Sequence, residues 1–246
     1  MRLKNTILLK PLITISIIIP VFNEEKTIKQ ILLSVKASKV KLYDFEIIVV
    51  EDGSTDKTLD ILLSNPSLYS KLIQQKRNQG KGAAIREGIL QASGDYILFQ
   101  DADLEYDPKD FQKLLLMVTK FDADLIIGSR FIAPEFTRVY YFWHKIGNKV
   151  ITLLFNIINN TTFTDIYSCY LLFKKDLLDI NDLKSNGWEQ QAEILSLLVS
   201  LNIKMFEVPI SYSGRTYGEG KKIRAHHIIA VIWMIIKKFF IIRVKR

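Results

Sequence analysis

Two kinds of segment alternate along the first half of the chain. One is a short apolar run, and the other is a longer segment with apolar residues at helical spacing. The runs are rich in β-branched residues, as in strands buried on both faces of a sheet. They predict strands at 15–20, 45–50, around 72–73, at 96–99 and at 123–128. The segments predict helices over about 24–37, up to about 63, over 81–92 and over about 109–120. This alternation favours an α/β fold with a doubly wound, mostly parallel sheet and flanking helices.

Polar residues at the expected helix starts predict the caps. Asn23 is placed to cap the first helix, and Ser54 or Thr55 the second. Asp107 precedes Pro108, and this pair is typical of an N-cap followed by the first helical residue.

The expected strand at 96–99 leads into acidic residues at alternate positions, Asp101, Asp103 and Glu105. Alternate residues of an extended segment point the same way, so these carboxylates could converge on one hard cation. In a parallel sheet, Pro20 and Asp52 would end at the same edge, where open α/β folds bind ligands. The alternative is a polar turn that caps the next helix, which would leave Asp101 and Asp103 unexplained.

The glycine pair in Asn78–Ala83 precedes an expected helix but matches no standard phosphate motif. It lacks the spacing of a P-loop, and no Gly-x-Gly-x-x-Gly follows the first strand. It could bring backbone N–H groups and Lys81 near an anion, or it could be a simple turn at a helix start.

Charge is concentrated at the C-terminus. The formal net charge is +8, yet residues 221–246 hold eight cations and no acid, which leaves residues 1–220 neutral. Apolar runs at 228–236 and 239–242 separate these cations and are too short for a membrane span of ~20 residues. The pattern favours a helix at a lipid headgroup boundary over a nucleic-acid surface, with a core helix as the alternative. Residues 139–158 form a second amphipathic, aromatic stretch, suited to core packing or to a membrane face.

The single cysteine, Cys169, excludes a disulfide framework and fits a reducing, cytosolic setting. We interpret it as structural. The chain is long enough for one large or two small domains.

Several motifs occur together and in a recognisable order. They are Ile-Ile-Ile-Pro20-Val-Phe-Asn-Glu24, Val50-Glu-Asp52-Gly-Ser-Thr-Asp56, Asn78-x-Gly-Lys81-Gly and Gly94-Asp-x4-Gln-Asp101-Ala-Asp103. Together they resemble a family 2 glycosyltransferase with the GT-A fold. The motifs around Thr164–Lys174, Glu207–Tyr212 and Arg215–Lys221 resemble the branch that transfers mannose or glucose to polyprenyl (dolichyl) phosphate. The resemblance covers about residues 15–224.

This resemblance implies a GT-A domain, placed at 1–224, and the charge pattern predicts a basic, membrane-associating tail over 225–246. Within the domain, 12–127 would form the nucleotide-sugar half, and 128–224 the acceptor half with a lid at 211–222. The implied nucleotide-binding residues are Pro20, Phe22, Glu24, Val50, Asp52, Lys81, Asp101 and Ala102. The implied ligands of Mg²⁺ or Mn²⁺ are Asp101, Asp103 and Glu105. The implied catalytic residues are Asp103, Arg130, Arg215 and Lys221.

The implied activity is inverting transfer of a hexose from a nucleotide sugar to a membrane polyprenyl phosphate, by a peripheral protein on the cytoplasmic face. GDP-mannose is favoured over UDP-glucose. A phosphate monoester has its second pKa near ~6, so this acceptor needs no strong base. That fits the expectation that His144, His226 and His227 lie away from the acids.

Two other functions stay open. A hydroxyl acceptor on a glycan or lipid would require a carboxylate base, with Asp165 or Glu193 as candidates. The second open function is that of a non-catalytic membrane scaffold with the same fold.

Overall fold

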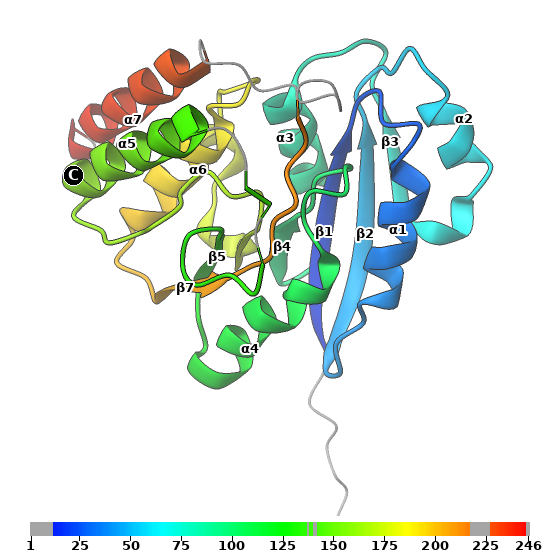
Figure 1. The fold of residues 1–246 in the computed structure, drawn as a ribbon, viewed down its shortest axis with the longest axis horizontal. Helices are drawn as coiled ribbons and strands as arrows, with labels where there is room; N and C mark the ends of the chain where they lie inside the picture. Colours follow the sequence, from blue (N-terminus) through cyan, green and yellow to red (C-terminus); the bar gives the residue numbers. More distant parts are fainter. Residues whose placement is uncertain (1–11, 137, 140–141, 217–226, 245–246) are drawn as a thin grey trace, which may run out of the picture.

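The computed structural model describes residues 12–136, 138–139, 142–216 and 227–244 (Figure 1). The strands among them are β1 (Ile13–Val21), β2 (Tyr43–Glu51), β3 (Lys71–Gln74), β4 (Tyr96–Phe99), β5 (Leu125–Ser129), β6 (Leu171–Lys174) and β7 (Met205–Pro209). The α-helices are α1 (Ile28–Ala37), α2 (Thr58–Leu63), α3 (Lys81–Gln91), α4 (Phe111–Phe121), α5 (Phe142–Asn159), α6 (Gln190–Val199) and α7 (His227–Val244).

The strands form one sheet in the order β3-β2-β1-β4-β6-β5-β7. β3, β2, β1 and β4 are parallel to one another, and β5 is parallel to β7. β6 lies between β4 and β5 and is antiparallel to both. The predicted mostly parallel α/β fold is therefore confirmed. The sequence patterns did not identify β6 and β7 as strands.

Helices cover the sheet, with α1 in front of it and α3 behind it in the view of Figure 1. As a result, Ile15, Ile17, Ile18 and Ile19 of β1 are fully buried, although successive strand residues point to opposite faces. This burial on both sides explains the continuous β-branched run in the sequence.

Two predicted helix starts are wrong. α1 begins at Ile28 after Thr27, and α2 begins at Thr58 after Lys57. Asn23 instead has a positive φ of 51°, and its Oδ1 accepts a hydrogen bond from Thr55 N at 2.8 Å. These polar residues tie together the loops after β1 and β2 and do not cap helices.

The predicted cap at Asp107 is confirmed. Its side chain accepts a hydrogen bond from Lys109 N at 3.0 Å, at the start of a 3₁₀ turn (Pro108–Asp110) that leads into α4.

The C-terminal helix α7 packs on α5 and α6, and in Figure 1 it lies beside α5 at one end of the molecule. Its inner face buries Val231, Met234 and Ile235. Lys238 on this face forms a buried ion pair with Glu193 of α6, with Nζ and Oε1 2.8 Å apart. One face of the basic segment is thus part of the core. Among the described helices, none combines the length and apolarity needed to cross a bilayer.

Candidate active site

A cleft of about 1130 Å³ opens at the carboxyl ends of β1, β2 and β4 and extends to α5 and α7. The strand ends form one side of this cleft, as predicted. Of the residues that the sequence suggested for nucleotide, metal or phosphate binding, the following line it: Pro20, Phe22, Glu24, Asp52, Lys81, Asp101, Ala102, Asp103, Glu105, Arg130 and Arg215.

Two suggested residues are not among the lining residues. Val50 is fully buried in β2, and its side chain lies on the side of the sheet covered by Gly88 of α3. That Val50 contacts a nucleotide stays a prediction, since its side chain is not among those that line the cleft. Lys221 lies outside the described residues, as does the part of the predicted lid beyond Thr216.

Asp52 anchors the glycine turn that precedes α3. Its carboxylate accepts hydrogen bonds from Gln79 N at 2.8 Å and from Gly80 N at 3.0 Å. Burial raises the pKa of Asp52, although these two hydrogen bonds oppose the rise. Gly80 has a φ of 96°, and a Cβ there would lie 2.4 Å from the Asn186 carbonyl oxygen, so this position requires glycine.

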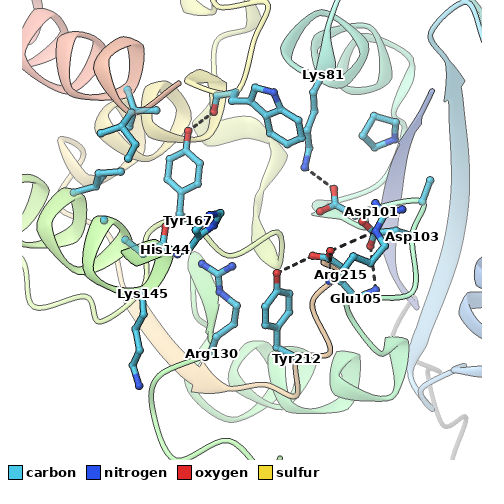
Figure 2. A pocket seen from close by; sticks show the side chains of 18 of the residues that line it. Lys81, Asp101, Asp103, Glu105, Arg130, His144, Lys145, Tyr167, Tyr212 and Arg215 are labelled. Atoms are coloured by element: carbon cyan, nitrogen blue, oxygen red, sulfur yellow. Dashed lines mark hydrogen bonds and ion pairs between the residues drawn. The ribbon is translucent and has the colours of Figure 1, made fainter. Parts of the chain in front are cut away.

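Arg215 lies beside Asp103 and Glu105 at the strand ends (Figure 2), and it also reaches Glu24. Its guanidinium contacts Glu24 at 3.1 and 3.2 Å and Asp103 at 2.6 Å, and its backbone N–H donates to Glu105 Oε1 at 2.7 Å. Tyr212 donates a hydrogen bond to the other oxygen of Glu105 at 2.7 Å. The segment after β7 is thereby fixed across the ends of β1 and β4.

The carboxylate of Asp101 points in a different direction, toward Lys81, with the two side chains 2.5 Å apart (Figure 2). Burial and, after it, the nearby charges of Asp101 and Glu105 raise the pKa of Asp103 to about 7, against the effect of Arg215. The acids are thus crowded enough to favour an additional cation.

The prediction that Asp101, Asp103 and Glu105 converge on one cation is not met in this structure. Within the described ranges, no three His, Cys, Asp or Glu side chains are grouped so that they could hold a metal ion. Glu105 is directed to Tyr212 and Arg215, because these come from the segment after β7, which the local sequence does not reveal. Asp101 and Asp103 do fit a divalent cation, since both line the cleft with the hard oxygen donors that Mg²⁺ and Mn²⁺ prefer.

Arg130 enters the cleft from the end of β5. Asp165 holds it through two side-chain hydrogen bonds, of 2.7 Å to Nε and 2.8 Å to Nη2. The guanidinium lies 5.0 Å from the centre of the Tyr212 ring, within the range of a cation–π contact. Burial works against the charge of Arg130, but Asp165 outweighs it and raises the pKa of Arg130.

The two carboxylates considered as bases for a hydroxyl acceptor are already engaged, and neither is among the lining residues. Asp165 pairs with Arg130. Glu193 pairs with Lys238 and accepts hydrogen bonds from Lys184 N and Ser185 N. Their partners lie on other elements of the fold, so the local sequence does not reveal these pairings.

His144 on α5 does line the cleft, on the side away from the acid cluster (Figure 2). His144 is therefore apart from the acids, as expected, but the expectation that it lies outside their cleft is wrong.

Several cleft residues were missed by the sequence analysis. Tyr167 donates a hydrogen bond to the Trp188 carbonyl oxygen at 2.6 Å, and Lys81 Nζ lies 5.2 Å from the centre of the Trp188 ring. Phe142 and Trp143 of α5 form part of an apolar wall. The aromatic stretch at 139–158 was the signal for this wall, whereas nothing local marked Trp188.

An α/β fold with polar side chains gathered at the carboxyl ends of its parallel strands defines a class of proteins that bind their ligands at this edge of the sheet. Within that class, the chain belongs to Glycosyl transferase family 2, whose profile matches residues 16–180.

Three curated relatives are similar to most of the chain. The low-salt glycan biosynthesis hexosyltransferase Agl6 of Haloferax volcanii is 30% identical over 82% of this chain and 48% of its own length. Dolichol-phosphate mannosyltransferase of Pyrococcus furiosus is 28% identical over 84% of this chain and 58% of its own. Dolichyl-phosphate β-glucosyltransferase ALG5D of Trichomonas vaginalis is 29% identical over 85% and 68%. The chain thus spans about half to two thirds of these proteins.

Among solved structures, glucosyl-3-phosphoglycerate synthase of Mycobacterium tuberculosis has a similar fold. Its complex with Mn²⁺, uridine diphosphate and phosphoglyceric acid superposes with a TM-score of 0.68 at 20% identity, over 92% of this chain and 78% of that one. The complex with uridine diphosphate gives 0.67 at 20% identity, over 94% and 80%.

Proposed function

We propose that this chain transfers a hexose, with mannose favoured, from a nucleotide sugar to a membrane polyprenyl phosphate, with inversion at the anomeric carbon. Two relatives are named for transfer to dolichyl phosphate, and solved structures of similar fold contain uridine diphosphate with Mn²⁺ or Mg²⁺.

The observation that carries this proposal is that one cleft joins two kinds of surface. Carboxylates and arginines line it at the strand ends, and apolar residues of α5 and α7 such as Trp143, Ile228 and Val231 line it at the other side. A nucleotide sugar needs only the polar surface. An acceptor with a charged head and an apolar chain needs both.

In the proposed reaction, an acceptor phosphate oxygen bonds to the anomeric carbon as the bond from that carbon to the donor diphosphate breaks. Asp101 and Asp103 would hold a divalent cation, which supplies positive charge to the leaving diphosphate when bound. Arg215 would donate to the diphosphate, and Arg130 to the acceptor phosphate. The acceptor is already anionic at neutral pH, so no side chain has to remove a proton.

A hydroxyl acceptor is the second candidate, and the position of His144 in the cleft favours it. Histidine is the commonest general base near neutral pH. UDP-glucose is the alternative donor, and a membrane scaffold without catalytic activity is the alternative outside the enzymes.

Calorimetric titration with GDP-mannose and with UDP-glucose, each with and without Mn²⁺ or Mg²⁺, tests the donor. We expect GDP-mannose to bind in the presence of the metal. Transfer to a prenyl phosphate is then compared with transfer to the corresponding prenol, and we expect product with the phosphate alone. Product with the prenol would favour the hydroxyl acceptor, and no nucleotide binding under any condition would favour the scaffold.

We also propose that α5 and α7 attach the protein peripherally to an anionic membrane, on its cytoplasmic face. Trp143 is 77% exposed and Phe240 is 62% exposed. Lys145, Lys149 and Lys237 lie on the same two helices and are exposed as well. Apolar side chains between cations suit a headgroup boundary.

Replacing both Trp233 and Phe240 by glutamate is expected to weaken binding to anionic vesicles by at least about tenfold, since each buried aromatic contributes about 1.5–3 kcal/mol. Vesicle flotation measures this. Leu33→Glu on α1, at a side chain that is 49% exposed, is the control and should leave binding unchanged. Point variants are preferable to removal of 225–246, because removal would uncover the core under Val231 and Ile235. Unchanged flotation of the double variant would contradict the proposal.

A further inference from the structure

Glu207 on β7 contacts the turn that contains Asp165, although 42 residues separate them in the chain. Its carboxylate accepts hydrogen bonds from Thr164 N at 2.9 Å, from Thr164 Oγ1 at 3.0 Å and from Asp165 N at 3.0 Å. The sequence motif Glu207–Tyr212 contains this residue but does not indicate its role. Its contacts place it directly behind the partner of Arg130.

Asp165 in turn holds Arg130 in position. It is fully buried, accepts from Nε and Nη2 of the guanidinium, and also accepts from the Arg130 backbone N–H at 3.1 Å. A carboxylate that binds both the backbone and the side chain of one arginine leaves that arginine little freedom to rotate.

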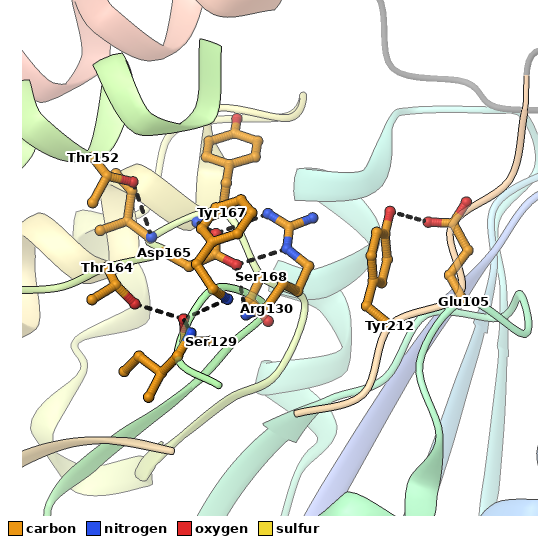
Figure 3. A network of polar contacts seen from close by, with 12 residues as sticks. Glu105, Ser129, Arg130, Thr152, Thr164, Asp165, Tyr167, Ser168 and Tyr212 are labelled. Atoms are coloured by element: carbon orange, nitrogen blue, oxygen red, sulfur yellow. Dashed lines mark hydrogen bonds and ion pairs between the residues drawn. The ribbon is translucent and has the colours of Figure 1, made fainter. Parts of the chain in front are cut away.

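Ser129 fixes the other side of Arg130 (Figure 3). Ser129 Oγ accepts from Phe131 N at 3.0 Å and from Ile132 N at 3.2 Å, and lies 2.6 Å from Thr164 Oγ1. An ionised carboxylate only accepts, so the Thr164 hydroxyl donates to Glu207. The Ser129 hydroxyl therefore donates to Thr164, and a chain of hydrogen bonds runs from the turn after Arg130 to Glu207.

The guanidinium held in this way presents one edge to the cleft. Within the described part of the chain, the hydrogen bonds of its side chain use Nε and Nη2, while Nη1 has none. Figure 2 shows the guanidinium directed into the cleft, near Tyr212. Asp165 offsets the positive charge of Arg130, so the pair offers a donor of fixed direction and not a net charge.

We propose that Glu207 is a positioning residue: through Thr164 and Asp165 it holds Arg130 so that Nη1 can donate to a phosphate in the cleft. Under the proposed function on which this rests, that phosphate is the acceptor's. If the affinity for phosphate depends on the direction of this hydrogen-bond donor, the affinity falls when the guanidinium is free to rotate, even though its charge remains.

Glu207→Gln tests this, because the amide replaces one acceptor oxygen with a donor that faces backbone N–H groups. We expect it to weaken binding of inorganic phosphate by about tenfold, the equivalent of one charge-assisted hydrogen bond. The KM for a short-chain prenyl phosphate should rise by a similar factor, while the KM for the nucleotide sugar stays within about twofold. Calorimetry measures the affinity for phosphate, and steady-state kinetics measure the two KM values. Circular dichroism confirms that the variant folds.

A double-mutant cycle separates positioning from general stability. In an Arg130→Lys background, Glu207→Gln should weaken phosphate binding no further. Asp124→Asn is the matched control, because Asp124 accepts from Lys204 N at 2.9 Å near the start of β7, away from Arg130. It should leave phosphate binding unchanged. Thr164→Val, which keeps the backbone contacts and removes only the hydroxyl, should weaken phosphate binding by about threefold.

Several outcomes would overturn the proposal. One is that Glu207→Gln binds phosphate as tightly as the wild type. Another is that Glu207→Gln weakens phosphate binding as much in the Arg130→Lys background as in the wild type, or that Asp124→Asn weakens it as much as Glu207→Gln does. The last is that the wild type binds no phosphate. If Glu207→Gln does not fold, wild-type affinity in Thr164→Val would overturn it. Failure of the proposed function is distinguishable, because the wild type would then give no prenyl-phosphate product while the phosphate-binding cycle still reports on Glu207.

Discussion

Asp103→Ala is expected to reduce hexose transfer by roughly 10³-fold, the scale seen when an electrostatic contact to the transition state is removed. Asp103 lines the cleft, is 9% exposed and contacts the Arg215 guanidinium at 2.6 Å. Under the proposed mechanism, its replacement removes an oxygen donor for the divalent cation, and it also removes one of the groups that hold Arg215. Both losses leave the diphosphate of the donor with less positive charge around it.

Formation of labelled glycolipid from the donor and a prenyl phosphate measures this effect. Asp107→Ala in the same loop is the control, since Asp107 only caps the 3₁₀ turn before α4. It should cost about 1 kcal/mol of stability and leave transfer intact. Undiminished product from Asp103→Ala would contradict the proposed mechanism.

Arg215→Ala is expected to cut turnover by at least about tenfold while the fold stays intact, because under the proposed mechanism it removes a charge-assisted hydrogen bond to the leaving diphosphate. The side chain lies in the cleft and not in the apolar core. Its removal leaves Glu24 and Asp103 without the guanidinium that contacts both. We therefore also expect Mn²⁺ to bind more tightly in the absence of nucleotide.

Steady-state rates and calorimetric titration of Mn²⁺ measure the two effects of this variant. Lys204→Ala, which removes a cation paired with Asp122 at the exposed surface, is the control and should change neither. A near-normal rate for Arg215→Ala would exclude this residue from the mechanism.

The sequence predicts well where local patterns determine the structure. The strand ends that place Asp52, Asp101 and Asp103 in one cleft follow from β-branched runs and parallel topology. The pairing of Arg215 with Glu24 joins residues 191 positions apart, so no local pattern encodes it. For the same reason Glu193 looked available as a base, although Lys238 from α7 occupies it.

The resemblance identified residues by motif but did not show which way their side chains point. Val50 was assigned to the nucleotide, yet the strand directs it to α3. Tyr167 and Trp188 line the cleft because loops of the second half fold back to the strand ends, and their positions depend on tertiary structure.

The position of β6 also has a consequence for synthesis on the ribosome. β6 pairs with β4 on one side and β5 on the other, but it lies more than 40 residues after β5 in the chain. The centre of the sheet therefore stays open while residues 130–170 emerge, with one edge of β4 and both edges of β5 unpaired, because β7 comes later still. Exposed edges of this kind are where nascent chains associate wrongly. A translational pause while residues 130–170 emerge should accordingly increase aggregation of this protein more than a pause after β6 has emerged.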